Sequence, residues 1–457
     1  MGIHMKVCLI SLGCDKNLAD SEIMISLLQE QGHTMVEAEE DADAIVINSC
    51  CFISDAKEES INTILECARY KEENLKFLVV AGCLAQRYSN EIREAIPEVD
   101  ALIGTSAYAD VAKVLNELDV SCAKAEAVQE TPETYVCFKE LDYLPELTVK
   151  RGHFTGTSYA YLKIAEGCDK HCTYCVIPSI RGPFRSIPME RILDEARELA
   201  AKGIKELILV AQETTLYGID LYGEKSLPKL LHELCKIDGP EWVRLMYCYP
   251  EEITDELIAV IRDEKKIVKY LDMPVQHASD AVLKRMGRRT NQKELRVQIQ
   301  KLRKEIPDII LRTSLITGFP GETESDFEEL CDFVREIRFD RLGVFTYSKE
   351  EGTPAAKLKP QVLQRIKRQR RDQIMHIQQE IAFERAKQRV GTVLEVQIEG
   401  AIPEEEIYVA RGYMDAPNVD GYVFVKAERG KLSGTIIKAR VVGAKGYDLI
   451  AEEIFDE

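Results

Sequence analysis

Two blocks of this sequence alternate strand-like and helix-like segments, and this alternation constrains the fold more than any other feature. The first block spans residues 5–118. Its apolar runs are Val7–Ser11, Ala44–Asn48, Phe77–Ala81 and Ala101–Gly104, with helix-like segments at Ser21–Gln31 and Asp55–Tyr70. Strands that alternate with helices form parallel sheets with helices on their faces. The first block therefore predicts an α/β domain built on an open parallel sheet.

The second block, residues 158–386, repeats the strand–helix pattern six times. Its candidate strands are Tyr159–Ile164, Glu206–Val210, Val243–Tyr247, Val268–Met273, Ile310–Ile316 and Leu342–Tyr347. Six successive strand–helix units predict a (βα)6-type partial barrel. In barrels of this kind the active site lies where the strands end.

The rest of the chain lacks this alternation. Residues 119–157 predict a linker with a short hairpin or arm, and residues 361–388 predict a long charged helix. Residues 387–457 contain short β-branched runs separated by glycine turns. Such runs are typical of a small antiparallel β-barrel. The predicted domains are therefore 5–118, 158–386 and 387–457, joined by the linker 119–157.

Three cysteines, Cys168, Cys172 and Cys175, lie within eight residues just after the first strand of the second block. Thiolates are the usual protein ligands of iron–sulfur clusters, and a [4Fe–4S] cluster takes four ligands. Three local thiols leave one iron open to a small molecule, so the spacing indicates catalysis. A zinc site with a distant fourth ligand is the alternative. Zinc ribbons pair one CxxC with another, however, and this sequence has no second CxxC.

Three more cysteines, Cys14, Cys50 and Cys83, each follow a strand of the first block. Because the carboxyl ends of parallel strands share one edge of a sheet, we expect these thiols to converge. They predict a second three-thiolate site with an open iron. Buried cysteines also occur as small apolar residues, but repetition at three successive strand ends favours the metal site. Cys51 should point elsewhere and is not a candidate.

Polar side chains follow later strands of the second block. Gln212 and Glu213 come after its second strand, and Gln276 and His277 come after its fourth. We expect these groups to face a common pocket at the strand ends. His277 fits a helix-cap role as well as a catalytic one.

Composition restricts the classes of partner. The chain has 14 cysteines and no export signal, so clustered thiols in a reducing, cytoplasmic compartment are expected to be metal or redox ligands. No apolar run is long enough for a transmembrane helix. The net charge of −18 argues against a broad nucleic-acid surface. A basic run at residues 357–371 is the local exception, and a run of this kind usually forms a solvated helix face.

Four motifs resemble those of the radical SAM methylthiotransferase family. They are Gly13–Asn17, Ile177–Gly182, Gln276–Asp280 and Tyr347–Pro354. The resemblance covers nearly the whole chain, with a radical SAM domain in the middle and a TRAM-like module at the end. The motifs favour the branch that modifies an aspartate of a small-subunit ribosomal protein over the branch that modifies tRNA adenosine. Asp15 replaces a proline that is usual in that branch, which bears on the loop around Cys14.

The resemblance implies two [4Fe–4S] clusters and S-adenosylmethionine (SAM) as cofactors. Cys168, Cys172 and Cys175 are expected to hold the cluster that binds SAM, and the other cysteine set to hold the cluster that presents sulfur. Both open irons must then face one cavity. The candidate SAM contacts are Tyr174, Gln212, Glu213 and Gln276. Catalytic residues other than the cluster ligands are not indicated.

The resemblance also implies the reaction, the transfer of a methylthio group to the β-carbon of an aspartate in ribosomal protein twelve at the decoding centre. The C-terminal module suits such a basic partner, because residues 388–457 carry thirteen acidic and eight basic residues, a net charge of −5. An electron donor such as a flavodoxin is expected, and direct nucleic-acid binding is expected to be weak or absent. A tRNA adenosine methylthiotransferase is the alternative. An iron–sulfur carrier or RNA-binding scaffold without turnover is a more distant one.

Overall fold

The computed structural model describes residues 4–128, 133–146, 150–402 and 406–455. The chain forms two compact units. The N-terminal unit consists of residues 1–154, 165–171 and 175–187, and the C-terminal unit consists of residues 155–164, 172–174 and 188–457. The boundary therefore crosses the cysteine-rich loop, which contributes residues to both units.

The N-terminal unit is an open sheet of six parallel strands in the order β2-β1-β3-β4-β5-β6. The strands are β1 (Lys6–Ser11), β2 (Thr34–Met35), β3 (Ala44–Ser49), β4 (Phe77–Gly82), β5 (Ala101–Ile103) and β6 (Tyr135–Cys137). The central strands β3 and β4 are buried along their whole length. The predicted parallel sheet is confirmed.

Helices cover both faces of this sheet. They are α1 (Asp15–Glu30), α2 (Ser54–Ala68), α3 (Cys83–Arg87), α4 (Ser89–Ala95), α5 (Val111–Val128) and α6 (Ile177–Arg181). Apolar residues of α1 and α5 pack on one face, and those of α2, α3, α4 and α6 pack on the other. A two-stranded ladder of β8 (Ala165–Glu166) and β9 (Arg185–Ser186) completes the unit.

The structure corrects the hairpin or arm expected within 119–157. Helix α5 continues to Val128, and β6 pairs in parallel with β5 as an edge strand. Three residues are too few to produce a strand pattern, so β6 could not be recognised from the sequence. Residues 129–132 and 147–149 of the predicted linker lie outside the described residues.

The C-terminal unit contains a second parallel sheet, in the order β14-β13-β12-β11-β10-β7. Its strands are β7 (Tyr159–Lys163), β10 (Glu206–Val210), β11 (Trp242–Leu245), β12 (Ile267–Asp272), β13 (Ile310–Thr317) and β14 (Arg341–Thr346). The connecting helices are α7 (Met189–Ala201), α8 (Ile219–Tyr222), α9 (Leu227–Cys235), α10 (Asp255–Asp263), α11 (Asp280–Arg285), α12 (Gln292–Glu305) and α13 (Glu324–Ile337). Strands that follow one another in the chain are neighbours in the sheet, which confirms the partial barrel.

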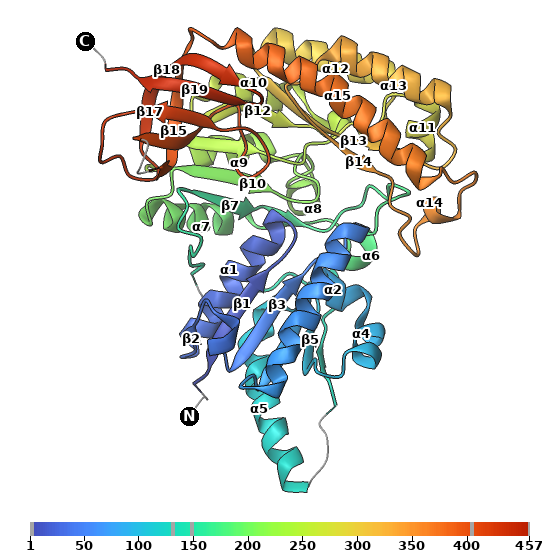
Figure 1. The fold of residues 1–457 in the computed structure, drawn as a ribbon, viewed down its shortest axis with the longest axis vertical. Coiled ribbons are helices and arrows are strands. Elements are labelled where there is room, and N and C mark those ends of the chain that lie inside the picture. The colour runs from blue at the N-terminus through green and yellow to red at the C-terminus, as the bar shows by residue number, and fades with distance from the viewer. Residues whose placement is uncertain (1–3, 129–132, 147–149, 403–405, 456–457) are drawn as a thin grey trace. The chain divides into compact units, whose positions relative to one another are not determined.

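A long helix leads from this sheet to the C-terminal barrel. Helix α14 (Pro354–Lys357) precedes α15 (Gln364–Gln388), which packs on α13, β14 and β18. In Figure 1, α15 runs from beside α14 to the barrel. The barrel strands are β15 (Val393–Ile402), β16 (Ile407–Gly412), β17 (Val423–Lys426), β18 (Ile436–Lys445) and β19 (Asp448–Glu453). The barrel is closed, and its ladders are antiparallel except for the parallel pair β17–β19.

The barrel shares one apolar core with residues on the sheet strands β7, β10, β11, β12 and β13. Tyr159, Trp242 and Tyr270 of the sheet belong to the same buried cluster as Val396 and Val423 of the barrel. The barrel and the second sheet therefore depend on each other for the burial of these side chains. Within the described residues, no helix is both long and apolar enough to cross a membrane.

A buried ion-pair network reinforces this junction. Glu206, at the start of β10, accepts hydrogen bonds from Arg244 Nε at 2.6 Å and from Arg411 Nη2 of the barrel at 2.7 Å. All three side chains are fully buried. Asp415 of the barrel likewise pairs with Arg341 of β14. Buried charges need such pairing, because an unpaired one is strongly destabilising.

Candidate cluster-binding cysteines

The three N-terminal cysteines come together at the carboxyl edge of their sheet, as the sequence predicted. Cys14 caps α1 after β1, Cys50 follows β3 directly, and Cys83 is the first residue of α3 after β4. A Cβ atom added to Gly13, which has a φ of +87°, would lie only 2.8 Å from Cys50 Sγ. Glycine at this position thus lets the turn that carries Cys14 pass close to Cys50.

The thiols of this set affect one another electrostatically. Burial, together with the neighbouring Cys83 and Cys14, raises the pKa of Cys50 to about 12. Burial also raises the pKa of Cys83, while Arg181 acts in the opposite direction. Three thiolates at such close quarters need a positive partner. An iron cluster supplies one, because thiolate is its preferred ligand.

Arg181 is a candidate site residue that the sequence reasoning missed. It ends α6 and is 2% exposed, and its guanidinium donates hydrogen bonds to Asp20 Oδ2 at 3.0 Å and Glu166 Oε2 at 3.2 Å. Asn17 Oδ1 accepts a third. Burial disfavours its charge, but Cys83, Glu166 and Asp20 hold its pKa well above the ordinary value. The motif Ile177–Gly182 contained Arg181, yet only the fold brings it to the thiols.

In the CxxxCxxC run, Cys168 and Cys175 belong to the N-terminal unit. Cys168 is 6% exposed, and its backbone N–H donates to Gly182 O at 3.1 Å. The Sγ of Cys175 accepts a hydrogen bond from the backbone N–H of Ile177 at 3.4 Å, at the start of α6. Backbone N–H groups of this kind stabilise a thiolate and suit a cluster ligand.

Cys172 belongs to the C-terminal unit and is 5% exposed. Its Sγ lies 3.2 Å from the hydroxyl oxygen of Tyr249. The Tyr249 ring stacks under Arg288, whose guanidinium carbon lies 4.1 Å from the ring centroid. Arg288 donates to Pro274 O at 3.1 Å. Nothing in the sequence pattern pointed to Tyr249 or Arg288, because neither belongs to a short motif.

Backbone hydrogen bonds anchor the centre of this loop to the C-terminal unit. Thr173 donates its N–H to Met286 O at 2.9 Å and accepts from Ala355 N–H at 2.9 Å. The Tyr174 ring packs edge-on against Phe319, at 6.4 Å between centroids. The loop is therefore held between the end of α11 and α14.

The other predicted SAM contacts lie at neighbouring strand ends. Gln212 and Glu213 follow β10, and Glu213 is fully buried and accepts from Thr215 N–H at 2.9 Å. Gln276 follows β12 with a φ of +70°, and its backbone bridges to β13 through Ser314 and Ile316. These residues lie at the carboxyl ends of the strands, where they were expected. The SAM contacts themselves stay a prediction.

His277 has a structural environment. Its ring is fully buried, and Nδ1 accepts from Ser279 N–H at 3.0 Å at the start of α11. The other ring nitrogen lies 3.6 Å from Glu322 Oε2. That carboxylate oxygen also accepts from the N–H groups of Gly318 and Phe319, at 2.7 and 3.1 Å. Of the two roles considered for His277, the geometry favours the helix cap.

Two further observations concern where a ligand could bind. Within the described ranges, no three His, Cys, Asp or Glu side chains are grouped around a single metal ion. A four-iron cluster holds its ligands around a larger body than one ion.

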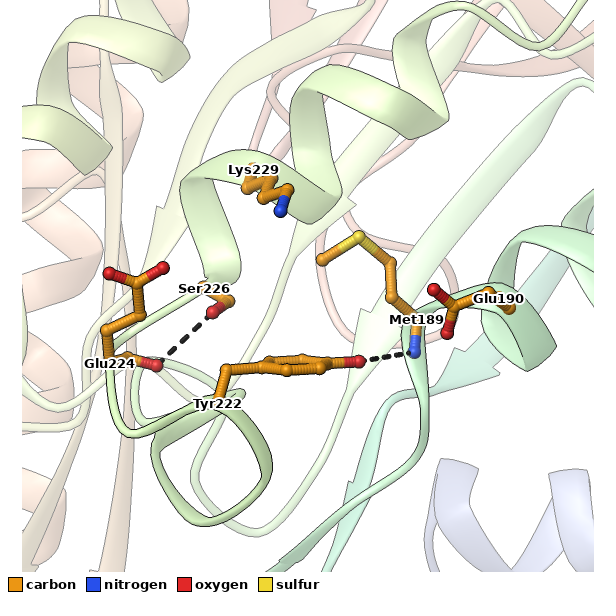
Figure 2. Close-up of a pocket in the computed structure, with 6 residues that line it drawn as sticks. All are labelled: Met189, Glu190, Tyr222, Glu224, Ser226 and Lys229. Atoms are coloured by element: carbon orange, nitrogen blue, oxygen red, sulfur yellow. Dashed lines mark hydrogen bonds between the residues drawn. The ribbon is translucent and has the colours of Figure 1, made fainter.

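A pocket near α8 and α9, shown in Figure 2, is lined by Met189, Glu190, Tyr222, Glu224, Ser226 and Lys229. It contains none of the predicted site residues.

Family models match three parts of the chain. Residues 6–104 match the Uncharacterized protein family UPF0004. Residues 162–334 match the Radical SAM superfamily, and residues 390–454 match the TRAM domain.

Curated relatives match over nearly the full length. The ribosomal protein uS12 methylthiotransferase RimO of Lachnoclostridium phytofermentans is 58% identical, covering 98% of this chain and 99% of the relative. The protein of the same name from Acetivibrio thermocellus is 50% identical, covering 98% of each. Among solved structures, the radical SAM methyltransferase TsrM from Kitasatospora setae has a TM-score of 0.53 at 14% identity and covers 77% of each chain. That likeness concerns the fold alone.

Proposed function

The chain belongs to the RimO family of radical SAM methylthiotransferases, and from this premise we propose that it adds a methylthio group to the β-carbon of an aspartate in ribosomal protein uS12. The assignment of the substrate rests on one observation, the identity of 50–58% over nearly the full length to relatives named for uS12. Relatives named for uS12 support this substrate over the tRNA alternative. A ribosomal substrate implies a cytoplasmic location.

The cofactors of this family are two [4Fe–4S] clusters and SAM. When bound, they supply the radical that removes a substrate hydrogen and the sulfur that replaces it. We assign one cluster to Cys168, Cys172 and Cys175 and the other to Cys14, Cys50 and Cys83. The assignment is supported by the hydrogen bonds to Cys172 and Cys175 and by the convergence of the other three thiols.

The chain's own residues prepare these sites. Arg181 places a fixed cation beside Cys83, which balances thiolate charge in a buried place. Tyr249 places its hydroxyl beside Cys172, and Glu322 shapes the Gly318–Gly321 turn at the end of β13. Tyr174, Gln212, Glu213 and Gln276 are proposed to orient SAM at the same edge. Each acts by binding and orientation, the main protein contribution to cofactor chemistry.

The proposed partners are uS12 and an electron donor such as a flavodoxin. Direct nucleic-acid binding is proposed to be weak or absent, as the net charge of −18 suggests. No membrane association is proposed.

The substrate proposal is tested in a deletion strain. Mass spectrometry of uS12 and of tRNA from that strain shows which of them loses its methylthio group. We expect uS12 to lose it and tRNA to keep it. Loss from tRNA with uS12 unchanged would assign the chain to the other branch.

The ligand assignment is tested by iron counting after anaerobic reconstitution. Cys14→Ala and Cys172→Ala should each bind about half of the parent's iron, because each disrupts one of two clusters. Cys14→Ala should still cleave SAM to 5′-deoxyadenosine with dithionite, whereas Cys172→Ala should not. Cys67→Ala, another buried cysteine, is the control and should bind the full amount. Full iron in Cys14→Ala would refute the second site.

A further inference from the structure

We propose that the exposed cations around the start of α15 form the docking surface for the acidic electron-donor protein that reduces the SAM-binding cluster. This inference rests on the proposed function, since that reaction needs an electron. The surface, called here the basic rim, consists of Lys357, Lys359, Leu363, Arg365 and Arg368.

The residues of the basic rim face solvent. Lys357, Lys359, Arg365 and Arg368 are exposed, and Leu363 is 62% exposed. Within the described ranges, no ion pair includes any of the four cations. Their neighbours in the basic run are used differently. Lys367 is buried and donates to Tyr347 O at 2.7 Å, and Arg370 pairs with Glu322 at 2.8 Å. The fold thus divides the run into structural and exposed cations.

Helix stability does not account for the exposed arginines. Arg365 lies in the first turn of α15, a turn without acidic residues, and Arg368 follows three residues later on the same side. The amino end of a helix carries a partial positive charge, so cations there weaken the helix. The dipole and the arginines instead add to one positive field, which attracts a negative partner.

The short helix α14, which carries Lys357 of the basic rim, is hydrogen-bonded to the cluster loop. Lys357 belongs to α14, and the N–H of Ala355 in that helix donates to Thr173 O at 2.9 Å. Thr173 lies between Cys172 and Cys175 in the sequence. The segment between α14 and α15 folds back on α14, because Gln361 donates to Ala355 O at 3.2 Å and to Leu358 O at 2.7 Å. A protein docked on the rim would therefore contact α14, the helix that is hydrogen-bonded to Thr173 of the loop.

These features fit a small acidic redox protein better than RNA. Transient redox partners bury little area, and a few charges around an apolar residue are enough to orient them. Because salt screens charges over about 10 Å, the positive field of the rim acts mainly on a small protein that contacts only the rim. An RNA strand would also extend over the rest of a chain with a net charge of −18 and be repelled there. The redox step is balanced, since one electron leaves the donor's reduced flavin and one enters the cluster.

The test uses the reconstituted holoenzyme and a purified bacterial flavodoxin as the probe. The variant Lys357→Glu with Lys359→Glu reverses two rim charges. The matched control, Lys426→Glu with Lys445→Glu, makes the same charge change on exposed barrel residues. Flavodoxin affinity and the stopped-flow rate of cluster reduction are measured at about 50 and 300 mM salt, between which screening strengthens.

We expect the rim variant to lose about tenfold in affinity and in reduction rate at low salt, with a smaller loss at high salt. The control should change less than twofold. Arg365→Glu with Arg368→Glu should reproduce the rim effect independently. Equal flavodoxin binding and reduction in parent and both rim variants would overturn the proposal. It would also be overturned if the variants lost binding to a labelled single-stranded RNA but kept flavodoxin.

A dithionite arm separates this proposal from the proposed function. Dithionite is a small reductant that needs no docking surface, so both rim variants should form 5′-deoxyadenosine from SAM at the parent rate. Absence of that product from the parent would refute the proposed function. Flavodoxin binding would still decide whether the rim is a docking surface.

Discussion

At the scale of single residues, Arg181 connects the buried charges of the N-terminal unit. It pairs with Asp20 and Glu166 and faces the thiols Cys14 and Cys83. The sequence was enough to propose Cys14, Cys50 and Cys83 as cluster ligands, because each of them follows a strand that the pattern predicts. Arg181 could not be proposed in this way, because an arginine shortly after a cysteine-rich run can have many ordinary roles. Arg181 reaches its partners only because α6 packs on the first sheet.

Replacing Arg181 with methionine should destabilise the protein and its N-terminal cluster. The substitution removes the buried guanidinium that pairs with Asp20 and Glu166, and loss of one member of a buried ion pair costs roughly 3–5 kcal/mol. Urea unfolding of the apo-protein measures this loss. Arg197→Met is the control, because its exposed pair with Asp194 should contribute less than about 1 kcal/mol. Unfolding free energies that match for parent and Arg181→Met would contradict the assignment.

Glu22 should make stability fall at acidic pH. Arg151 Nε and His153 Nδ1 lie 3.0 and 3.3 Å from its carboxylate. Burial alone would raise the pKa of Glu22, but the His153 hydrogen bond and the Arg151 charge outweigh it and lower the pKa from 4.5. The stabilisation is therefore present at pH values above the pKa of Glu22 in the unfolded chain. It is lost as the pH falls through the lower pKa of Glu22 in the folded protein.

Glu22→Gln should consequently flatten the decline in unfolding free energy between about pH 5 and pH 3. Chemical denaturation at several pH values measures it. Glu30→Gln, at the exposed end of the same helix, should leave the decline as in the parent. An unchanged decline in Glu22→Gln would show that other groups cause it.

At the scale of elements, long and strongly patterned segments were predictable. All six strands of the second sheet lie within one or two residues of the expected bounds. The strands β7, β10, β11 and β12 are buried along most of their length, and parallel strands buried on both faces read as apolar runs. Shorter elements were missed. β2 and β6 have two and three residues, and α3 has five. Such elements depend on neighbours that are distant in sequence, so local patterning does not reveal them.

The start of β10 is the element on which attachment of the barrel most depends. Glu206 is fully buried, and Arg244 and Arg411 together hold its pKa below the ordinary value although burial opposes this. Glu206→Gln leaves the buried Arg244 without its carboxylate partner and Arg411 with Glu399 alone, so we expect a loss of roughly 3–5 kcal/mol in unfolding free energy. Limited proteolysis should then cut faster near Arg389. Glu395→Gln, an exposed barrel residue, should change neither measurement.

At the scale of the whole molecule, the net charge counted from the sequence differs from the charge that a partner would meet at the surface. The net charge of −5 over residues 388–457 suggested an acidic surface for a basic partner. Three of those carboxylates are used inside the C-terminal unit. Asp415 pairs with Arg341, Glu399 pairs with Arg411, and Asp420 accepts a hydrogen bond from Tyr270 at 2.7 Å. A partner would therefore meet a less acidic barrel than the sequence implies.

The barrel should not be separable from the sheet. A chain ending at Gln388 would expose Tyr159, Trp242 and Tyr270, which pack in the core shared with the barrel. Buried aromatic side chains contribute about 150–250 Å² each, and an exposed apolar patch of several hundred Å² promotes aggregation. We expect this shortened chain to aggregate in size-exclusion chromatography. A chain ending at Phe455 keeps all five barrel strands and should stay monodisperse. If the chain ending at Gln388 were monodisperse and still cleaved SAM with dithionite, the barrel would be an independent module.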